Sequence, residues 1–271
     1  MTRPWLEPVA RWVARHRHNL VVRRVGGLAR HWLDWQANLD YELASNGEAQ
    51  VLRTLSRFAP QLIVDAGANV GDWSLAALDL CPSANVHAFE IAAPTFATLR
   101  QRTQGETRLT AHAMGLSDAQ GEITLHHYAD APALTTATAY PHPLPSQVLA
   151  ARVVRGDDFV AEQGIGHIDL LKIDVEGMEA QVLRGFDGLL RAQGVDLVQF
   201  EYGRVNILSR FLLADFHAFF AERGYRVGKI YPDGVDFRDY DMADEDFRGP
   251  NYLACLQRRT DLLQALAAPA A

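Results

Sequence analysis

Short apolar runs and amphipathic stretches alternate along most of this chain. Residues 62–64 and 168–173 are β-branched and aliphatic runs of the length expected for buried parallel strands. Residues 179–190, which follow the second run, show the apolar spacing of a helix. Because strands and helices alternate, the pattern predicts an α/β chain with a doubly wound sheet. Further strands are expected at 85–89, 107–113, 123–128 and 195–201, further helices from Pro94 and over 210–222, and a terminal antiparallel pair at 225–231 and 251–257.

The two ends of the chain do not follow this alternation. Residues 1–58 look helical, poor in turns and rich in tryptophan and arginine, and we assign them to an N-terminal extension. The extension could cap an active site, form a dimerisation arm, touch anionic lipid, or simply pack on the domain with its arginines in solvent. Residues 59–258 form the main domain, and the alanine-rich tail 259–271 is expected to fray. Within the main domain, the proline-rich stretch 129–147 is a natural lid or substrate loop.

Composition excludes several classes of protein. Of the 271 residues, 48% are hydrophobic and 22% charged, which is typical of a globular protein. The net charge is −7, so non-specific binding of nucleic acid is not expected. Residues 1–30 nevertheless carry seven arginines and one acid, a charge of +6 that leaves −13 for the rest of the chain. These thirty residues are therefore the part that could contact a membrane surface peripherally.

The cysteine content and the lengths of the apolar runs indicate the cellular compartment in which we expect the protein. Cys81 and Cys255 provide neither a disulfide framework nor a metal-ligand spacing. No apolar run approaches the ~18 residues of a membrane span, and the N-terminus lacks the apolar segment of a signal peptide. We expect a cytoplasmic protein.

A glycine-containing turn follows the first strand, in the sequence DAGANVG at 65–71. Gly67 and Gly71 allow close approach of a ligand to the backbone, next to the N-terminus of the following helix. Dinucleotide-binding turns use three glycines and seat a pyrophosphate, which the carboxylate of Asp65 would repel. That carboxylate could instead attract the ammonium group of S-adenosylmethionine (SAM), a cofactor without phosphate.

Acidic residues occupy the ends of four predicted strands: Asp65, Glu90, Asp174 and Glu201. In doubly wound sheets, ligands bind beyond the carboxyl ends of the strands. Each acid by itself could be a helix cap or a surface charge. Their convergence on one edge predicts a binding site, with Glu90 placed to accept ribose hydroxyls.

Three sequence blocks resemble the FkbM-like family of class I SAM-dependent methyltransferases: residues 65–71, LSDAQG at 116–121, and IDLLKIDVEGME at 168–179 with VLRG at 182–185. The resemblance covers roughly residues 60–257, and its KIDVEG block is more specific than the glycine turn. It departs at Gly156, where the family usually has leucine. It implies a Rossmann-like, seven-stranded and mostly parallel sheet with an antiparallel last strand, and O-methylation of sugars or natural products.

The resemblance also implies roles for individual residues. Asp174 would stand beside the sulfonium of SAM and the acceptor hydroxyl, as a cofactor and catalytic residue, together with the catalytic acids Glu176 and Glu201. The remaining cofactor-binding residues are Asp65, Gly67, Ala68, Asn69 and Gly71 for the methionine part, Glu90 for the ribose, and Ile91, Met114, Gly115 and Ser117 for the adenine.

Two routes could activate an acceptor hydroxyl. Asp174 or Glu201 could be a general base with a pKa raised by the other's charge, or both could bind Mg²⁺. Their placement resembles the metal carboxylates of catechol-type methyltransferases, but Tyr202 stands where those enzymes have asparagine, so we assign no metal ligand. The histidines at 126, 127, 142, 167 and 217 are alternative bases.

We therefore expect a SAM-dependent O-methyltransferase acting on a small-molecule or glycan acceptor, with a homodimer as one use of the aromatic extension. A nicotinamide-dependent oxidoreductase would need a hydride-handling group such as Tyr-x-x-x-Lys and a third glycine at the turn, and residues 65–71 lack that glycine. A non-catalytic binding module docked through its basic N-terminus is the rival of another class.

Overall fold

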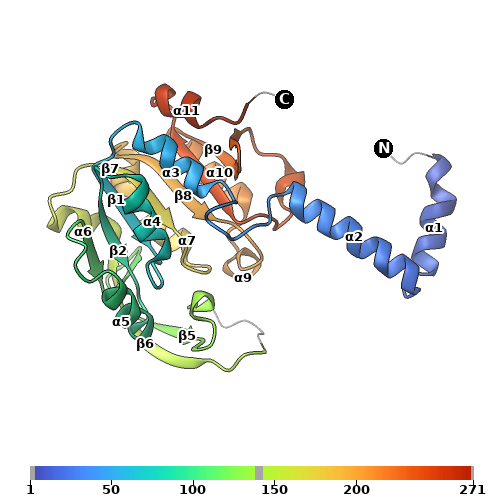
Figure 1. The fold of residues 1–271 in the computed structure, drawn as a ribbon, viewed down its shortest axis with the longest axis horizontal. Coiled ribbons are helices and arrows are strands. Elements are labelled where there is room, and N and C mark those ends of the chain that lie inside the picture. Colours follow the sequence, from blue (N-terminus) through green and yellow to red (C-terminus); the bar gives the residue numbers. More distant parts are fainter. Residues whose placement is uncertain (1–3, 138–142, 270–271) are drawn as a thin grey trace.

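A computed structural model describes residues 4–137 and 143–269 and places an eight-stranded sheet at the centre of the chain (Figure 1). The strand order is β10-β9-β11-β8-β7-β1-β2-β3. The strands are β1 (Leu62–Ala66), β2 (Asn85–Phe89), β3 (Leu109–His112), β7 (Ile168–Ile173), β8 (Val195–Glu201), β9 (Tyr225–Tyr231), β10 (Gly234–Phe237) and β11 (Asn251–Leu256).

The expected α/β fold with a mostly parallel sheet is confirmed. Strands β3, β2, β1, β7 and β8 pair in parallel. β11 runs antiparallel between β8 and β9, and β10 forms a hairpin with β9. Within the described residues, the central sheet therefore has one strand more than the seven expected, because the chain turns back after Tyr231 and pairs once more.

Two hydrophobic layers cover the sheet, because successive residues of each strand point to opposite faces. On one face, Leu171 and Ile173 pack with α6 (Gly156–Glu162), α7 (Glu179–Gly185), α8 (Asp187–Arg191) and α10 (Leu213–Ala221). On the other, Ile63 and Leu170 pack with α3 (Glu48–Ser56), α4 (Asp72–Leu80), α5 (Ala93–Arg102) and α11 (Thr260–Leu266). The helix expected over 179–190 is therefore two short helices, since the α7 segment ends at Gly185.

The C-terminal segment does not fray as expected. Residues 260–266 form α11, in which Leu262 and Leu266 are buried against α3 and the sheet. The prediction of a frayed tail is therefore wrong for this helix, because two leucines spaced four apart give it an apolar face for the core.

A second, three-stranded sheet lies beside the glycine turn. It contains β4 (Gly115–Ser117), β6 (Gln147–Arg155) and β5 (Gly121–His127) in the order β4-β6-β5. A short helix, η2 (Pro132–Leu134), follows β5 within the proline-rich stretch. Residues 138–142 of the loop that we expected to be a lid lie outside the described residues.

The N-terminal extension has two parts. Short helix η1 (Pro4–Leu6) leads into α1 (Glu7–Arg15), and α1 and α2 (Leu20–Gln36) extend away from the body of the molecule (Figure 1). Neither α1 nor α2 buries a residue, whereas six residues of α3 are buried. One short helix, α9 (Asn206–Ser209), and the short helix η3 (Met242–Asp244) complete the described chain. None of its helices is long and apolar enough to cross a membrane.

The packing of α11 predicts that the C-terminal helix contributes to stability. Leu262 is fully buried, so Leu262→Ala should lower the free energy of unfolding by about 2–5 kcal/mol, because it removes buried methyl groups and leaves a cavity. Denaturant titration of the full chain measures this change. The matched control Leu28→Ala removes the same atoms from the exposed face of α2 and should change the value by less than ~0.5 kcal/mol. Equal effects of the two substitutions would contradict the packing.

Candidate functional site

The glycine turn after β1 brings the backbone of three strands together. Gly67 and Ala68 donate backbone hydrogen bonds to the carbonyl of Phe89 at 3.0 and 2.8 Å. Gly67 has φ +89°, and a Cβ there would lie 1.8 Å from the carbonyl oxygen of Asp174. Only glycine fits this position, because both the conformation and the space exclude a side chain. Gly71 (φ +92°) begins α4 and packs against Leu99.

A buried lysine lies between the acids of two strands. The Lys172 ammonium is 3.4 Å from Asp65 Oδ1 and 3.1 Å from Asp174 Oδ2. Burial alone would lower the pKa of Lys172, but the charges of Asp174 and Asp65 outweigh burial and raise it, so the ammonium stays charged. Asp65 is fully buried, and its Oδ2 accepts a hydrogen bond of 2.6 Å from Ser74 Oγ. The described partners of this carboxylate are therefore Lys172 and α4.

Asp174, Glu176 and Glu201 come together at the carboxyl ends of β7 and β8. One oxygen from each lies within 4.8 Å of the others. Burial would raise the pKa of Asp174, but the Lys172 ammonium holds it below its usual range. Burial and the charge of Asp174 raise the pKa of Glu176 to about 8, and burial, Asp174 and Glu176 raise that of Glu201 well above its usual range. The pKa values of the three acids thus move apart, with the negative charge favoured on Asp174 and the protonated form favoured on the two glutamates.

A cavity beside the glycine turn contains Glu90 and Asn69. Glu90 accepts backbone hydrogen bonds from Asn69 (3.0 Å) and Ala92 (2.7 Å), and burial raises its pKa to about 7. The buried Oδ1 of Asn69 finds no partner within the described part of the chain. Both polar groups face the same cavity, whose apolar walls come from β2, β4, β5 and β6. Its lining includes Gly67, Phe89, Ile91, Gly115, Leu116, Ile123, Leu125, Val153 and Asp174.

Other predicted cofactor residues lie just outside this cavity. Ala68 lines a neighbouring pocket, to which Lys172 and also Asn69 contribute. Met114 packs against the core, and Ser117 is buried with its hydroxyl 3.4 Å from Asp118 Oδ1. Ile91 and Gly115 are thus the predicted adenine residues that the structure brings to the cavity.

A wider cavity also borders the three acids. Asp174, Glu176 and Glu201 line it together with Tyr41, Arg204, Ala133, Leu134, Val205 and Leu208. Tyr41 comes from the segment between α2 and α3, and Arg204 from the segment after β8. Since the cavity has both apolar and charged walls, it suits a polar organic ligand.

Sequence reasoning missed Lys172, Tyr41 and Glu48. Lys172 is inside the KIDVEG block, and its position in a strand of otherwise apolar residues was a signal of a buried ion pair. Glu48 is buried on α3 and accepts a hydrogen bond of 2.5 Å from Gln199 on β8. Nothing in the local pattern around Tyr41 or Glu48 connects them with strands 130 or more residues away.

None of the described histidines lines the cavities around Asp174. His126 and His127 lie on β5, and His217 lies on α10, where burial lowers its pKa. His142 lies outside the described residues.

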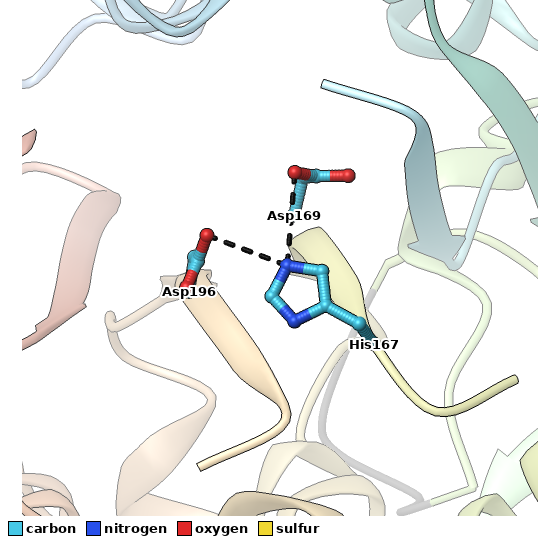
Figure 2. Close-up of side chains that lie close together, drawn as sticks. All are labelled: His167, Asp169 and Asp196. Atoms are coloured by element: carbon cyan, nitrogen blue, oxygen red, sulfur yellow. Dashed lines mark ion pairs between the residues drawn. The ribbon is translucent and has the colours of Figure 1, made fainter. Parts of the chain in front are cut away.

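His167 lies at the opposite edge of the sheet, beside the start of β7. Its Nε2 is between two carboxylates, 3.4 Å from Asp196 and 3.7 Å from Asp169 (Figure 2). Both acids already have other partners, because Asp196 pairs with Arg259 and Asp169 accepts the backbone N–H groups of Gln61 and Leu62. This cluster is an ion-pair network that ties strand starts together, far from the acids at the strand ends.

The chain is similar to known methyltransferases. The model of the methyltransferase FkbM domain matches residues 65–227. The hexuronic acid methyltransferase AglP of Haloferax volcanii is 26% identical over 162 residues, 58% of this chain and 64% of that protein. The 31-O-demethyl-FK506 methyltransferase FkbM of Streptomyces tacrolimicus is 32% identical over 158 residues, 46% of this chain and 59% of that protein. This chain thus spans about three fifths of the length of these relatives.

One solved structure is that of a methyltransferase FkbM from Methylobacillus flagellatus, 15% identical, which aligns with 72% of this chain and 44% of that chain at a TM-score of 0.46. The match to the FkbM domain covers more than half of the chain. It includes both the glycine turn and the KIDVEG block. The chain belongs to the FkbM methyltransferase family.

Proposed function

We propose that this protein transfers a methyl group from SAM to a hydroxyl of a sugar-containing or secondary-metabolite acceptor. The observation that carries the proposal is that Asp174, whose pKa Lys172 holds below its usual range, lines two cavities. Glu90 lies in one and Glu201 in the other, and Glu176 borders both. Family membership supports methyl transfer. The names of the two relatives, a hexuronic acid methyltransferase and a 31-O-demethyl-FK506 methyltransferase, support a hydroxylated acceptor.

The residues around the first cavity fit SAM. Glu90 would accept the ribose hydroxyls, since its carboxylate lines the cavity and each carboxylate oxygen has a second lone pair besides the one that the N–H of Asn69 or Ala92 engages. Ile91 and Gly115 would contact the adenine, and the unpartnered Oδ1 of Asn69 would accept from the methionine part. Bound SAM supplies an activated methyl group on its sulfonium.

Asp65 would act as a positioning residue. It was predicted to lie near the ammonium group of SAM, but its described contacts are Ser74 and Lys172. We propose that it orients Lys172 and thereby the carboxylate of Asp174.

The chain's own groups can handle the acceptor's proton. A hydroxyl is a poor nucleophile near neutral pH and gains from a positioned base. We propose Asp174 as that base, because Lys172 keeps it ionised, and Glu201 as the residue that donates a hydrogen bond to it. Glu176 also lines the cavity that we propose for the acceptor.

The same three carboxylates could ligate Mg²⁺, since each offers one oxygen. The Lys172 ammonium, however, already places a positive charge 3.1 Å from Asp174 and would repel a divalent ion. We therefore propose the proton-transfer route without a metal.

Titration calorimetry should detect SAM binding, with NAD⁺ as the comparison ligand. Glu90→Gln removes the charged acceptor for the ribose hydroxyls and should weaken SAM binding about 10- to 100-fold, the usual value of hydrogen bonds to a charged group. Glu122→Gln, on the exposed side of β5, is the matched control and should bind as tightly as the unmodified protein. A folded sample that binds NAD⁺ but no SAM would overturn the cofactor assignment and favour the oxidoreductase; a sample that binds neither would favour the non-catalytic binding module.

If Asp174 is the base, its substitution should lower the rate of methyl transfer much more than it lowers the affinity for SAM. Methyl incorporation from labelled SAM into a panel of uronic-acid glycans and hydroxylated macrolides should fall about 10²- to 10⁴-fold in Asp174→Asn, because the base is lost. SAM affinity should change by less than about tenfold, since the amide keeps the size of the side chain. The exposed acid of α4 provides the control Asp79→Asn, which should retain full turnover. Unchanged turnover in Asp174→Asn would exclude it as the base.

The pH profile distinguishes the possible bases. Lys172 holds the pKa of Asp174 below its usual range, so kcat/KM for the acceptor, measured at saturating SAM, should stay nearly level as the pH falls from about 7 to 5 and decline only below that. A histidine base would lose activity near its ordinary pKa of about 6.5. Ionisation of Glu176 as the essential step would instead make kcat/KM rise up to about pH 8, its raised pKa. Either of these profiles would contradict Asp174 as the base.

A further inference from the structure

Helices α1 and α2 expose large apolar side chains on one side of each helix. On α1, Val9, Trp12 and Val13 lie on one side and Glu7, Arg11 and Arg15 on the other, at helical spacing. Trp12 is 52% exposed and Leu28 of α2 is 71% exposed. The apolar face of α2 consists of Val21, Val22, Val25, Leu28, Trp32 and Leu33.

The opposite face of α2 is basic. Arg23, Arg24 and Arg30 lie there, and all three are exposed without an ion-pair partner in the described chain. The one pair within α1 is Arg11 with Glu7, at 4.0 Å. The two helices therefore combine a tryptophan-, valine- and leucine-rich face with an arginine face that is almost free of acids.

The body of this chain covers neither face. α1 and α2 extend away from the sheet (Figure 1), and their connection to the body lies at the end of α2. There, Asp34 pairs with Arg248 at 3.4 Å, and the Asn38 side chain donates to the carbonyl of Ile230 at 3.0 Å. The attachment is thus polar and local, and the exposed apolar residues must face water or another surface.

We propose that α1 and α2 form a docking element that lies in the headgroup region of a membrane containing anionic phospholipid. Helices with arginine on the polar face and tryptophan, leucine and valine on the other lie in this interface, where the apolar face enters the acyl boundary and the arginines meet lipid phosphates. The charge of +6 on residues 1–30 complements such a surface, and the −13 of the rest of the chain is repelled by it.

A second copy of the chain is a less suitable partner for the two faces of α1 and α2 than an anionic membrane. Its acidic body could neutralise the arginines but would leave the tryptophan faces in water. Pairing of the apolar faces would bring together helices whose flanks carry arginines of one sign, whereas paired helices usually place both signs there. An anionic bilayer surface is the partner that meets both faces at once.

Vesicle co-sedimentation of the full chain, without SAM or acceptor, tests this proposal. The unmodified protein should bind vesicles of phosphatidylcholine with one quarter phosphatidylglycerol more tightly than pure phosphatidylcholine, and high salt should weaken the binding. Arg23→Glu with Arg30→Glu should reduce partitioning about 30-fold or more, since each arginine near an anionic surface contributes roughly fivefold. The control pair Arg53→Glu with Arg100→Glu makes the same charge change on the exposed body and should have little effect.

Substitutions in the apolar face of α2 provide a second test in the same vesicle experiment. Val25→Ser with Leu28→Ser keeps every arginine and should also reduce partitioning at least tenfold, with the melting temperature unchanged because both residues are exposed. Equal binding to both lipid mixtures, or equal loss in the control pair, would overturn the proposal. A stable dimer in sedimentation velocity that this double substitution converts to monomer, without vesicle binding by the unmodified protein, would assign the face to a second copy and overturn it as well. None of these readouts depends on methyl transfer.

Discussion

The charged Lys172 ammonium, buried between two strands, is the interaction on which the site depends. Lys172 is the register partner of Asp65 on β1 and of Gln199 on β8, so its side chain lies at the centre of the sheet. Burying a charge is costly unless it is paired, and here two carboxylates share one ammonium. The pairing fixes β1 against β7 and at the same time sets the protonation state of Asp174.

This constraint separates the acids into two groups. Asp65 and Glu48 lie on the face covered by α3 and α4, where Ser74 and Gln199 satisfy them. Asp174, Glu176 and Glu201 lie past the strand ends, where solvent-accessible cavities meet. Because three carboxylates crowd one point and only one has a close ammonium partner, their pKa values move apart. A site in which one acid favours the ionised form and two favour the protonated form can both accept a proton and orient the group that releases it.

Much of the fold could be predicted from local patterns. Buried strands such as 168–173 are apolar along their length because helices cover both faces, which makes them recognisable without knowledge of their neighbours. The strand-end acids were also predictable, since parallel strands in a doubly wound sheet deliver their ends to the same edge. Two predictions were wrong where structure depends on distant partners. The leucines of α11 are buried because they pack against α3, and β10 joins the sheet because the chain reverses and pairs with β9.

The sequence by itself determined the α/β class, the glycine turn, the position of Glu90 and the family, because each depends on residues close together in the chain or on the period of a strand. Only the tertiary structure decided which acid is paired, since Lys172 meets Asp65 through the β1–β7 register and not through sequence distance. It likewise decided that Tyr41 and Arg204 face the same cavity and that the apolar faces of α1 and α2 have no cover in this chain. Contacts between distant segments depend on how the helices pack on the sheet, and this packing cannot be predicted from a local sequence pattern.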